Sequence, residues 1–323
     1  MDVFSISFLE DPGRNNAWFD FCSNAFGGGE ELADYFRSSW NADPSRSINR
    51  VLTARNKQGE LLSSLTILSR KMQLCRRAVS VGGIATVCTR PDQQGKGIAG
   101  QLLRKAISYM EERGDEISLL GTAIPDYYRR FGWERIASRR WEWIPAQKAE
   151  RMPGILHPPS GNDWEAVGRL YEAEVKKGRR NGMLHRKAPE DWAAWLARKG
   201  CRWMVCEDGE GIRSYCGALS EDNVLDIREF GCRDGAEDDF SVLTAGQNWA
   251  AACDTGGAGW NKAACCAGFP APASAVAGRI DGLLLRLMRP LALDGRSFQK
   301  TEELIGYLEQ SEIPFSFSEN DSF

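Results

Sequence analysis

The segment RPDQQGKGIAGQLLRKAI, residues 90–107, places two glycines and a lysine at the expected start of a helix. A helix start leaves about four backbone amides without partners and carries roughly half a positive charge. Gly95 and Gly97 would let an anion approach those amides with no side chain in between, and Lys96 adds a cation. This combination is suited to binding a diphosphate.

Two nucleotide-binding motifs were compared with this segment. The mononucleotide loop Gly-x4-Gly-Lys-Ser/Thr is absent, and the dinucleotide fingerprint appears only in a poor form that begins at Gly95 and ends at Gly100. No acidic residue ends a following strand at the distance that the dinucleotide fingerprint requires. Taken alone, the segment also fits a plain strand-to-helix turn.

The neighbouring elements alternate between strand and helix. Residues 77–91 are predicted to form a long buried strand, with a bulge expected at Gly82-Gly83. The helix that follows has an apolar stripe at helical spacing and is expected to end near Gly114. Three further elements are then predicted: a strand at 117–123, a short helix at 126–132 and a strand at 133–144.

The chain has 323 residues, which is enough for two domains with cores of their own. A stretch at 145–163 contains four prolines and has the composition of a linker. Beyond it the order of elements in the first half recurs, with a strand predicted at 279–291. We therefore expect an α/β fold with mixed sheets, made of a first domain at 1–147 and a second, degenerate copy at 148–323.

Composition limits the function classes. The net charge of -3 provides no positive field that would recruit nucleic acid or an anionic membrane. Ten scattered cysteines and two histidines do not form a zinc pattern, so no metal is expected. The sequence shows neither a signal peptide nor a membrane span, which favours a cytoplasmic protein with reduced thiols.

The pattern Gln94-x-x-Gly97-x-Ala99, with the long strand before it and ISLLGTA and YYRRFGW after it, resembles the signature of the Gcn5-related N-acetyltransferase (GNAT) superfamily. The resemblance extends over residues 1–144 in element order and is close at 81–133. Within the superfamily, the sequence is similar to the enhanced-intracellular-survival type, which has tandem GNAT folds. That type usually continues into a third, sterol-carrier-like domain, whereas this sequence ends near the end of the second repeat.

The resemblance implies a binding site for acetyl-CoA across the end of the strand at 81–89. Main-chain groups of Val87 and Thr89 would pair with the pantetheine arm, and an amide near Val87 would polarise the thioester carbonyl. The pyrophosphate would be surrounded by Gln94, Gly95, Lys96, Gly97, Ile98 and Ala99.

Tyr128 occupies the position of the proton donor in the family pattern and would protonate the departing CoA thiolate. A thiol pKa lies about 1.5 units below that of a tyrosine, and Arg129 or Arg130 is expected to reduce this difference. The alternative is that Tyr128 is an aromatic residue of the core.

The resemblance also implies a role for the chain's last carboxylate, on Phe323, which would reach into the active site and attract an amine. A disordered acidic tail is the alternative for this segment. The second repeat has no Gln-x-x-Gly-x-Gly pattern before the helix predicted at 238–254, so we expect it to bind no acetyl-CoA.

The resulting hypothesis is an N-acyltransferase that moves acetyl from acetyl-CoA to a primary amine of a small molecule or peptide. Direct attack in a ternary complex is favoured because Cys88, on the cofactor strand, has no histidine partner evident in the sequence. Two alternatives remain open: a catalytically silent CoA-binding sensor or scaffold, and a nucleotide-binding oxidoreductase that uses NAD. The sequence leaves open the acceptor, the acyl-chain preference and whether the chain forms a homo-oligomer.

Overall fold

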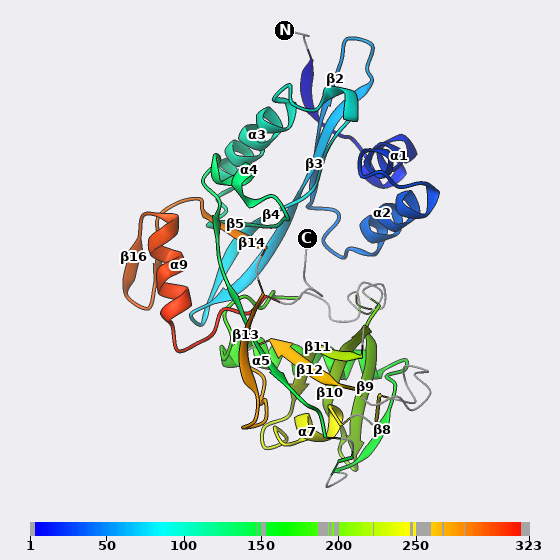
Figure 1. Ribbon diagram of the computed structural model, residues 1–323, viewed down its shortest axis with the longest axis vertical. Helices are drawn as coiled ribbons and strands as arrows, with labels where there is room; N and C mark the ends of the chain where they lie inside the picture. The colour runs from blue at the N-terminus through cyan, green and yellow to red at the C-terminus, as the bar shows by residue number, and fades with distance from the viewer. Residues whose placement is uncertain are drawn as a thin grey trace.

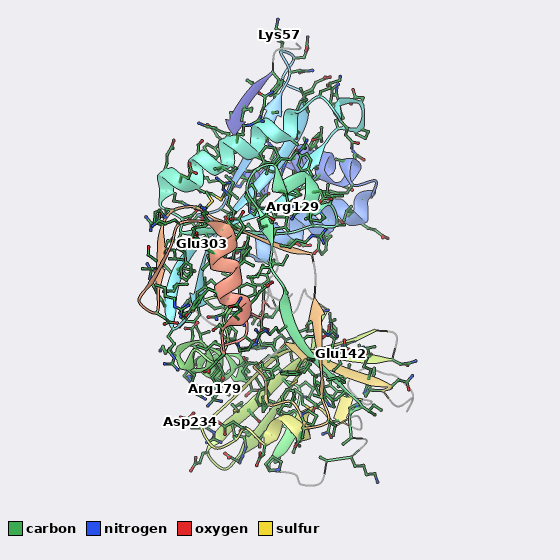
Figure 2. All side chains as sticks on the ribbon, turned by 60° about the vertical axis from the view of Figure 1, so that its left-hand side comes forward. Lys57, Arg129, Glu142, Arg179, Asp234 and Glu303 are labelled. Atoms are coloured by element: carbon green, nitrogen blue, oxygen red, sulfur yellow. The ribbon has the colours of Figure 1, made fainter. Side chains whose placement is uncertain are left out.

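The computed structural model describes most of the chain. The described residues are 4–146, 148–149, 153–186, 193, 196, 200–221, 223–245, 248–249, 260–266, 268–280 and 282–317. They form two seven-stranded sheets and a small two-stranded sheet. The two large sheets follow one another along the long axis of the molecule (Figure 1), so that Lys57 lies near one end and Asp234 near the other (Figure 2).

The first sheet has the strand order β1-β2-β3-β4-β5-β14-β6. Its strands are β1 Ser5–Phe8, β2 Arg50–Arg55, β3 Leu61–Leu74, β4 Arg77–Thr89, β5 Ile117–Gly121, β14 Leu283–Leu287 and β6 Glu134–Arg135. Neighbouring strands are antiparallel except β4 and β5, which are parallel because a helical crossover joins them. This pair determines where the site lies.

Helices cover both faces of the first sheet (Figure 1). Side chains along β2 point alternately to the two faces of the sheet. Leu52 packs into the cluster that contains the long helix after β4, whereas its neighbour Val51 packs with the two N-terminal helices on the other face. The helical segments of this half are η1 Pro12–Arg14, α1 Asn16–Ala25, α2 Glu30–Ala42, η2 Pro91–Gln93, α3 Ile98–Arg113 and α4 Pro125–Arg129.

Helix α3 forms as its apolar stripe predicts. Its buried side chains include Leu102, Leu103, Ala106 and Met110, and the helix ends at Gly114, which has φ 84° and is therefore well suited to a left-handed C-cap. The expected bulge at Gly82-Gly83 is not found. Gly82 instead permits close packing, since a Cβ atom there would overlap the Met110 side chain and lie 2.9 Å from Asp115 Oδ2.

The second sheet has the order β13-β7-β12-β11-β10-β9-β8. Its strands are β13 Val276–Ile280, β7 Ser138–Trp143, β12 Lys262–Cys266, β11 Val224–Cys232, β10 Gly211–Glu221, β9 Arg202–Asp208 and β8 Ile155–His157. It also has a parallel pair, β11 and β12, as expected for a repeat of the first fold. The remaining elements are α5 Asp163–Lys177, α7 Asp239–Leu243, β15 Leu291–Leu293, β16 Arg296–Phe298 and α9 Thr301–Gln310. The predicted mixed α/β class is confirmed.

The two sheets exchange strands. The single strand predicted at 133–144 is divided into β6, which belongs to the first sheet, and β7, which belongs to the second. The strand predicted at 279–291 is likewise divided into β13 and β14, which join different sheets around Gly282, a residue with φ 101°. The boundary at residue 147 stays a prediction, and each sheet contains one strand from the far side of it.

Strand β14 also holds the helix that carries Tyr128. The strand pairs with β5 on one side and β6 on the other. Its Arg286 donates a hydrogen bond from Nη1 to the carbonyl oxygen of Phe131, just beyond the end of α4. The Arg286 guanidinium carbon also lies 5.7 Å from the centre of the Trp133 ring. The turn after β5 is therefore fixed by a residue from the C-terminal part of the chain.

We expect Gly82→Ala to lower the free energy of unfolding by about 1–3 kcal/mol, because the added methyl group overpacks a site closed by the fully buried Met110. Gly121→Ala is the matched control, since a Cβ atom at that position of β5 has no neighbour within 4 Å. Urea denaturation of both variants measures the difference. Equal stability of the two variants would contradict the packing role of Gly82.

We expect Arg286→Met to loosen α4, because it removes the donor to Phe131 while keeping an apolar stem of similar length. Loss of one such hydrogen bond costs about 1–2 kcal/mol, which corresponds to roughly tenfold faster amide exchange in residues 125–133. Hydrogen exchange with mass spectrometry measures this locally. Arg296→Met on β16 is the control, and unchanged exchange in the Arg286 variant would show that β14 does not restrain α4.

Candidate active site

The site begins where β4 and β5 separate. Their parallel pairing covers Val81–Ile117, Gly82–Ser118 and Gly83–Leu119 and then stops. Strand β4 continues to Thr89, and there it pairs only with β3 among the described strands. Among the described residues, backbone groups on the β5 side of residues 84–89 therefore have no strand partner, and a ligand that lies between the strands can bind there.

A bulge turns the end of β4. The register between β3 and β4 shifts between Ser64 and Thr66, opposite residues 85–88, and Thr86 has φ 50°. A β-branched residue with positive φ is rare and strained, and such strain is concentrated at functional sites. The bulge lies directly before Val87, which faces the cavity described below. It therefore sits three to four residues beyond the predicted position.

The loop between β4 and α3 presents unpaired amides. Gly95 and Gly97 have φ 76° and 78°, and a Cβ atom at either position would have no neighbour within 4 Å. Gln101 is the first residue of α3 whose amide has an acceptor, the Gly97 carbonyl. Within the described residues, the amides of 97–100 donate no hydrogen bond. They form an open anion-binding surface at the positive end of α3.

The predicted cofactor residues gather around one cavity of about 730 Å³. Seven of the eight line it, and Lys96 is the exception: its Nζ lies 2.9 Å from Gln93 Oε1. The Gln94 side chain reaches back to the Thr89 carbonyl at 3.4 Å and so ties the loop to the end of β4. The volume falls within the range of about 300–1,000 Å³ that is usual for ligand sites.

Tyr128 lines the same cavity from α4. Its side chain is 7% exposed and stands nearly perpendicular to the rings of Tyr127 and Trp133. No hydrogen-bond partner of its hydroxyl occurs among the described residues. Burial, with a smaller contribution from Tyr127, raises the pKa of Tyr128 to about 12.

The expectation that Arg129 or Arg130 reduces the pKa of Tyr128 is wrong. Arg129 Nε pairs with Glu134 at 3.1 Å, and the Arg130 guanidinium lies 4.7 Å from the centre of the Tyr127 ring. Burial acts on Tyr128 without compensation from either charge. The reason is geometric, because neighbours on a short helix point in different directions.

Several residues that line the cavity were not predicted from the sequence, among them Arg104, Tyr127 and Phe131. Helical spacing gave a signal for one of them. Arg104 lies seven residues after Gly97, about two turns along the same face of α3. Phe323 lies outside the described residues.

Cys88 points away from the cavity. It belongs to the cluster formed with α1 and α2, and its Sγ lies 3.8 Å from Sγ of Cys22. The hydrogen bond with Cys88, together with burial, raises the pKa of the Cys22 thiol. The two histidines lie elsewhere, His185 beside Gln73 and His157 beside Glu207. Among the described residues, Cys88 therefore has no histidine beside it, and it does not line the cavity.

The corresponding helix start in the second sheet has the opposite charge. After β11 the chain enters α7 at Asp239, which is 2% exposed and accepts hydrogen bonds from Ser214 and Arg213. Glu237 and Asp238 precede it. Carboxylates at this position repel a phosphate.

Neither a metal-binding group nor a membrane-spanning helix is found among the described residues. Within the described residues, no group of three or more His, Cys, Asp or Glu side chains is arranged to hold a metal ion. Among the helices of the same residues, none has both the length and the apolar composition needed to cross a bilayer.

Comparisons with known proteins agree with this geometry. Residues 12–136 match the family model described as an acetyltransferase (GNAT) domain. A comparison with curated proteins gave no match.

Three solved structures share the fold along most of the chain. A GCN5-related N-acetyltransferase from Kribbella flavida has a TM-score of 0.66 at 16% identity, covering 88% of this chain and 71% of that one. A second, from Anabaena variabilis ATCC 29413, has a TM-score of 0.65 at 18% identity, with 89% and 73% covered. Eis1 from Mycobacterium abscessus has a TM-score of 0.59 at 15% identity, with 89% and 74% covered. Residues 12–136 thus match the acetyltransferase (GNAT) domain, and the fold of the chain is that of the GCN5-related N-acetyltransferases.

Proposed function

We propose that the chain is an acyl-CoA-dependent N-acyltransferase that moves acetyl from acetyl-CoA to a primary amine. One observation carries the proposal: the unpaired amides of the α3 start, the separated edge of β4 and the buried Tyr128 all border the same cavity. The first binds a diphosphate, the second binds an extended amide-containing arm, and the third donates a proton. A CoA thioester has the matching parts in the same order: a diphosphate, a pantetheine arm that contains amides, and a sulfur that leaves as a thiolate.

The loop residues bind the phosphates. The amides of Gly97, Ile98 and Ala99 supply donors, and Gly95 and Gly97 leave room for the oxygen atoms. Main-chain groups of Val87 and Thr89 bind the pantetheine arm as a further strand would, since β5 has left this edge of β4. Lys96 adds positive charge to the loop rather than a contact inside the cavity.

The end of β4 also polarises the reacting carbonyl. The bulge at Thr86 turns the Val87 amide out of the regular ladder, and a fixed amide can stabilise the negative charge that develops on the thioester oxygen. Because Cys88 faces α1, the amine attacks directly and no enzyme-bound acyl group is formed. The amine must lose its proton, and the acceptor is a small-molecule or peptide amine.

Tyr128 stabilises the leaving thiolate. Full transfer of a proton from a phenol with a pKa of about 12 to a thiolate whose acid has a pKa of about 8.5 costs about 5 kcal/mol. The hydroxyl therefore shares its proton with the sulfur as charge develops, and does not lose it before the bond breaks. Its raised pKa keeps the proton in place throughout the physiological pH range.

The second domain has a supporting role in this proposal. The acidic start of α7 does not accept a diphosphate, so a single acetyl-CoA binds per chain. The domain supplies β14 to the first sheet and receives β7 from the first half of the chain, so the two halves are joined by the strand exchange.

The test of the function measures release of the CoA thiol from acetyl-CoA with polyamines, aminoglycosides, amino acids and peptide amines. We expect turnover with at least one class, and a larger rise in Tm with acetyl-CoA than with NAD or NADH, because a ligand that binds only the folded state stabilises it. Tight binding of acetyl-CoA with no turnover over the whole panel would support a sensor or scaffold. A larger shift with the nicotinamide cofactor would indicate an oxidoreductase.

We expect Tyr128→Phe to reduce kcat by about 10²-fold or more, with a change of less than about threefold in the KM for acetyl-CoA, since the hydroxyl acts on the leaving group. In the wild type, log kcat should rise from pH 6 to pH 10 as the amine loses its proton. It should not fall again in this range, because the raised pKa keeps Tyr128 protonated.

The matched control is Tyr109→Phe on α3, where the ring packs against Phe8 with 4.9 Å between centroids. A Tyr128 variant that retains more than half of the wild-type kcat would remove this residue from the mechanism.

A further inference from the structure

Two arginines of the cavity have no partner of opposite charge. Arg104 on α3 and Arg130 just after α4 both line it. Within the described residues, neither guanidinium lies within 4 Å of a carboxylate. Arg130 Nε donates to the Tyr127 carbonyl at 3.3 Å, whereas the adjacent Arg129 is paired with both Asp126 and Glu134. In the described part of the chain, these two cavity-lining cations are therefore not compensated by a carboxylate.

The two charges flank one aromatic surface. The guanidinium carbons of Arg104 and Arg130 lie 5.5 Å and 5.8 Å from the centre of the Phe131 ring. Arg130 also lies over Tyr127, and both arginines lower the pKa of the Tyr127 hydroxyl, although burial raises it overall. These observations place both cations in the same small region, beside the half-buried rings of Tyr127 and Phe131.

This region is separate from the glycine loop. Arg104 follows Gly97 by seven residues, and a helix rises about 1.5 Å per residue, so the backbone of Arg104 lies roughly 10 Å along α3 from Gly97. Seven residues correspond to about two turns, which keeps Arg104 on the face that borders the cavity. The cavity thus has a second cationic region beyond the glycine loop, with aromatic side chains beside it.

We propose that Arg104 and Arg130 bind the 3′-phosphate of CoA, so that the site distinguishes CoA from 3′-dephospho-CoA. The inference rests on the proposed function and extends it to the far end of the ligand. CoA carries a diphosphate, an adenine ring and a phosphate monoester on the ribose, and the monoester has a charge of about -1.5 to -2 at pH 7. The diphosphate occupies the helix start, the monoester meets the two guanidiniums, and the adenine lies against Phe131.

We expect a moderate preference for CoA over 3′-dephospho-CoA. Both arginines are exposed, so solvent and salt screen their attraction to an anion. Arginine nevertheless binds phosphate through paired, charge-assisted hydrogen bonds, which are stronger than neutral ones. We expect the wild type to bind CoA about tenfold more tightly than 3′-dephospho-CoA at low salt, and this preference to shrink as salt is added.

The experiment measures Kd by calorimetry for CoA and 3′-dephospho-CoA with the wild type, Arg104→Ala, Arg130→Ala and the double variant. In the double variant we expect the two ligands to bind equally, with CoA weakened about tenfold and 3′-dephospho-CoA nearly unchanged. Arg129→Ala is the control: it removes one adjacent charge, but Arg129 is paired with Glu134 and is not among the residues that line the cavity. It should retain the wild-type preference.

Two outcomes would overturn the inference while leaving the proposed function intact. The wild type would bind CoA and 3′-dephospho-CoA equally, or the double variant would weaken both ligands by the same factor, which would assign the arginines to the diphosphate. Failure of the wild type to bind CoA, dephospho-CoA and acetyl-CoA would overturn the proposed function as well. Adenosine 3′,5′-bisphosphate compared with adenosine 5′-monophosphate repeats the test without the acyl end of the ligand.

Discussion

The separation of β4 from β5 is the constraint on which the site depends. Two parallel strands that stop pairing after Gly83 and Leu119 leave a row of backbone donors and acceptors facing each other across a gap. Such groups need partners, and a ligand with its own amides can supply them. The loop before α3 follows β4 and α4 follows β5, so both lie at the carboxyl ends of these parallel strands, where the gap opens. Chain connectivity therefore brings the phosphate loop and Tyr128 to one cavity.

Much of this arrangement could be predicted from local spacing. The apolar stripe of α3, its end at Gly114 and the glycines before it are properties of short segments, and the structure has them where the sequence indicates. Tyr128 and seven of the eight predicted cofactor residues line one cavity because they belong to neighbouring segments of a single crossover. Such features depend on contacts between residues that are close along the chain.

Features that depend on distant residues could not be predicted. The residue pattern at 133–144 and 279–291 indicates strands, but it does not say to which sheet each strand belongs, and both segments are divided between the two sheets. The direction of the side chains around α4 could not be predicted from the sequence either. Arg130 was expected to act on Tyr128, but it lies over the ring of Tyr127. The bulge was expected at the glycines, whereas the chain places it at Thr86 and uses Gly82 to admit Met110. Neither glycine content nor periodicity reports what packs against a strand.

The insertion of β14 has a consequence for how the protein is made. A ribosome releases the chain from its N-terminus, so β1 to β5 can pair long before residues 283–287 have been synthesised. Until then β5 has an open edge, α4 lacks the arginine that holds its end, and β6 has no strand beside it. The first half of the nascent chain can collapse around α3, but Tyr128 reaches its final position only after residues 283–287 have been synthesised. Assembly of the cavity therefore waits for a strand that lies far downstream of Tyr128 in the sequence.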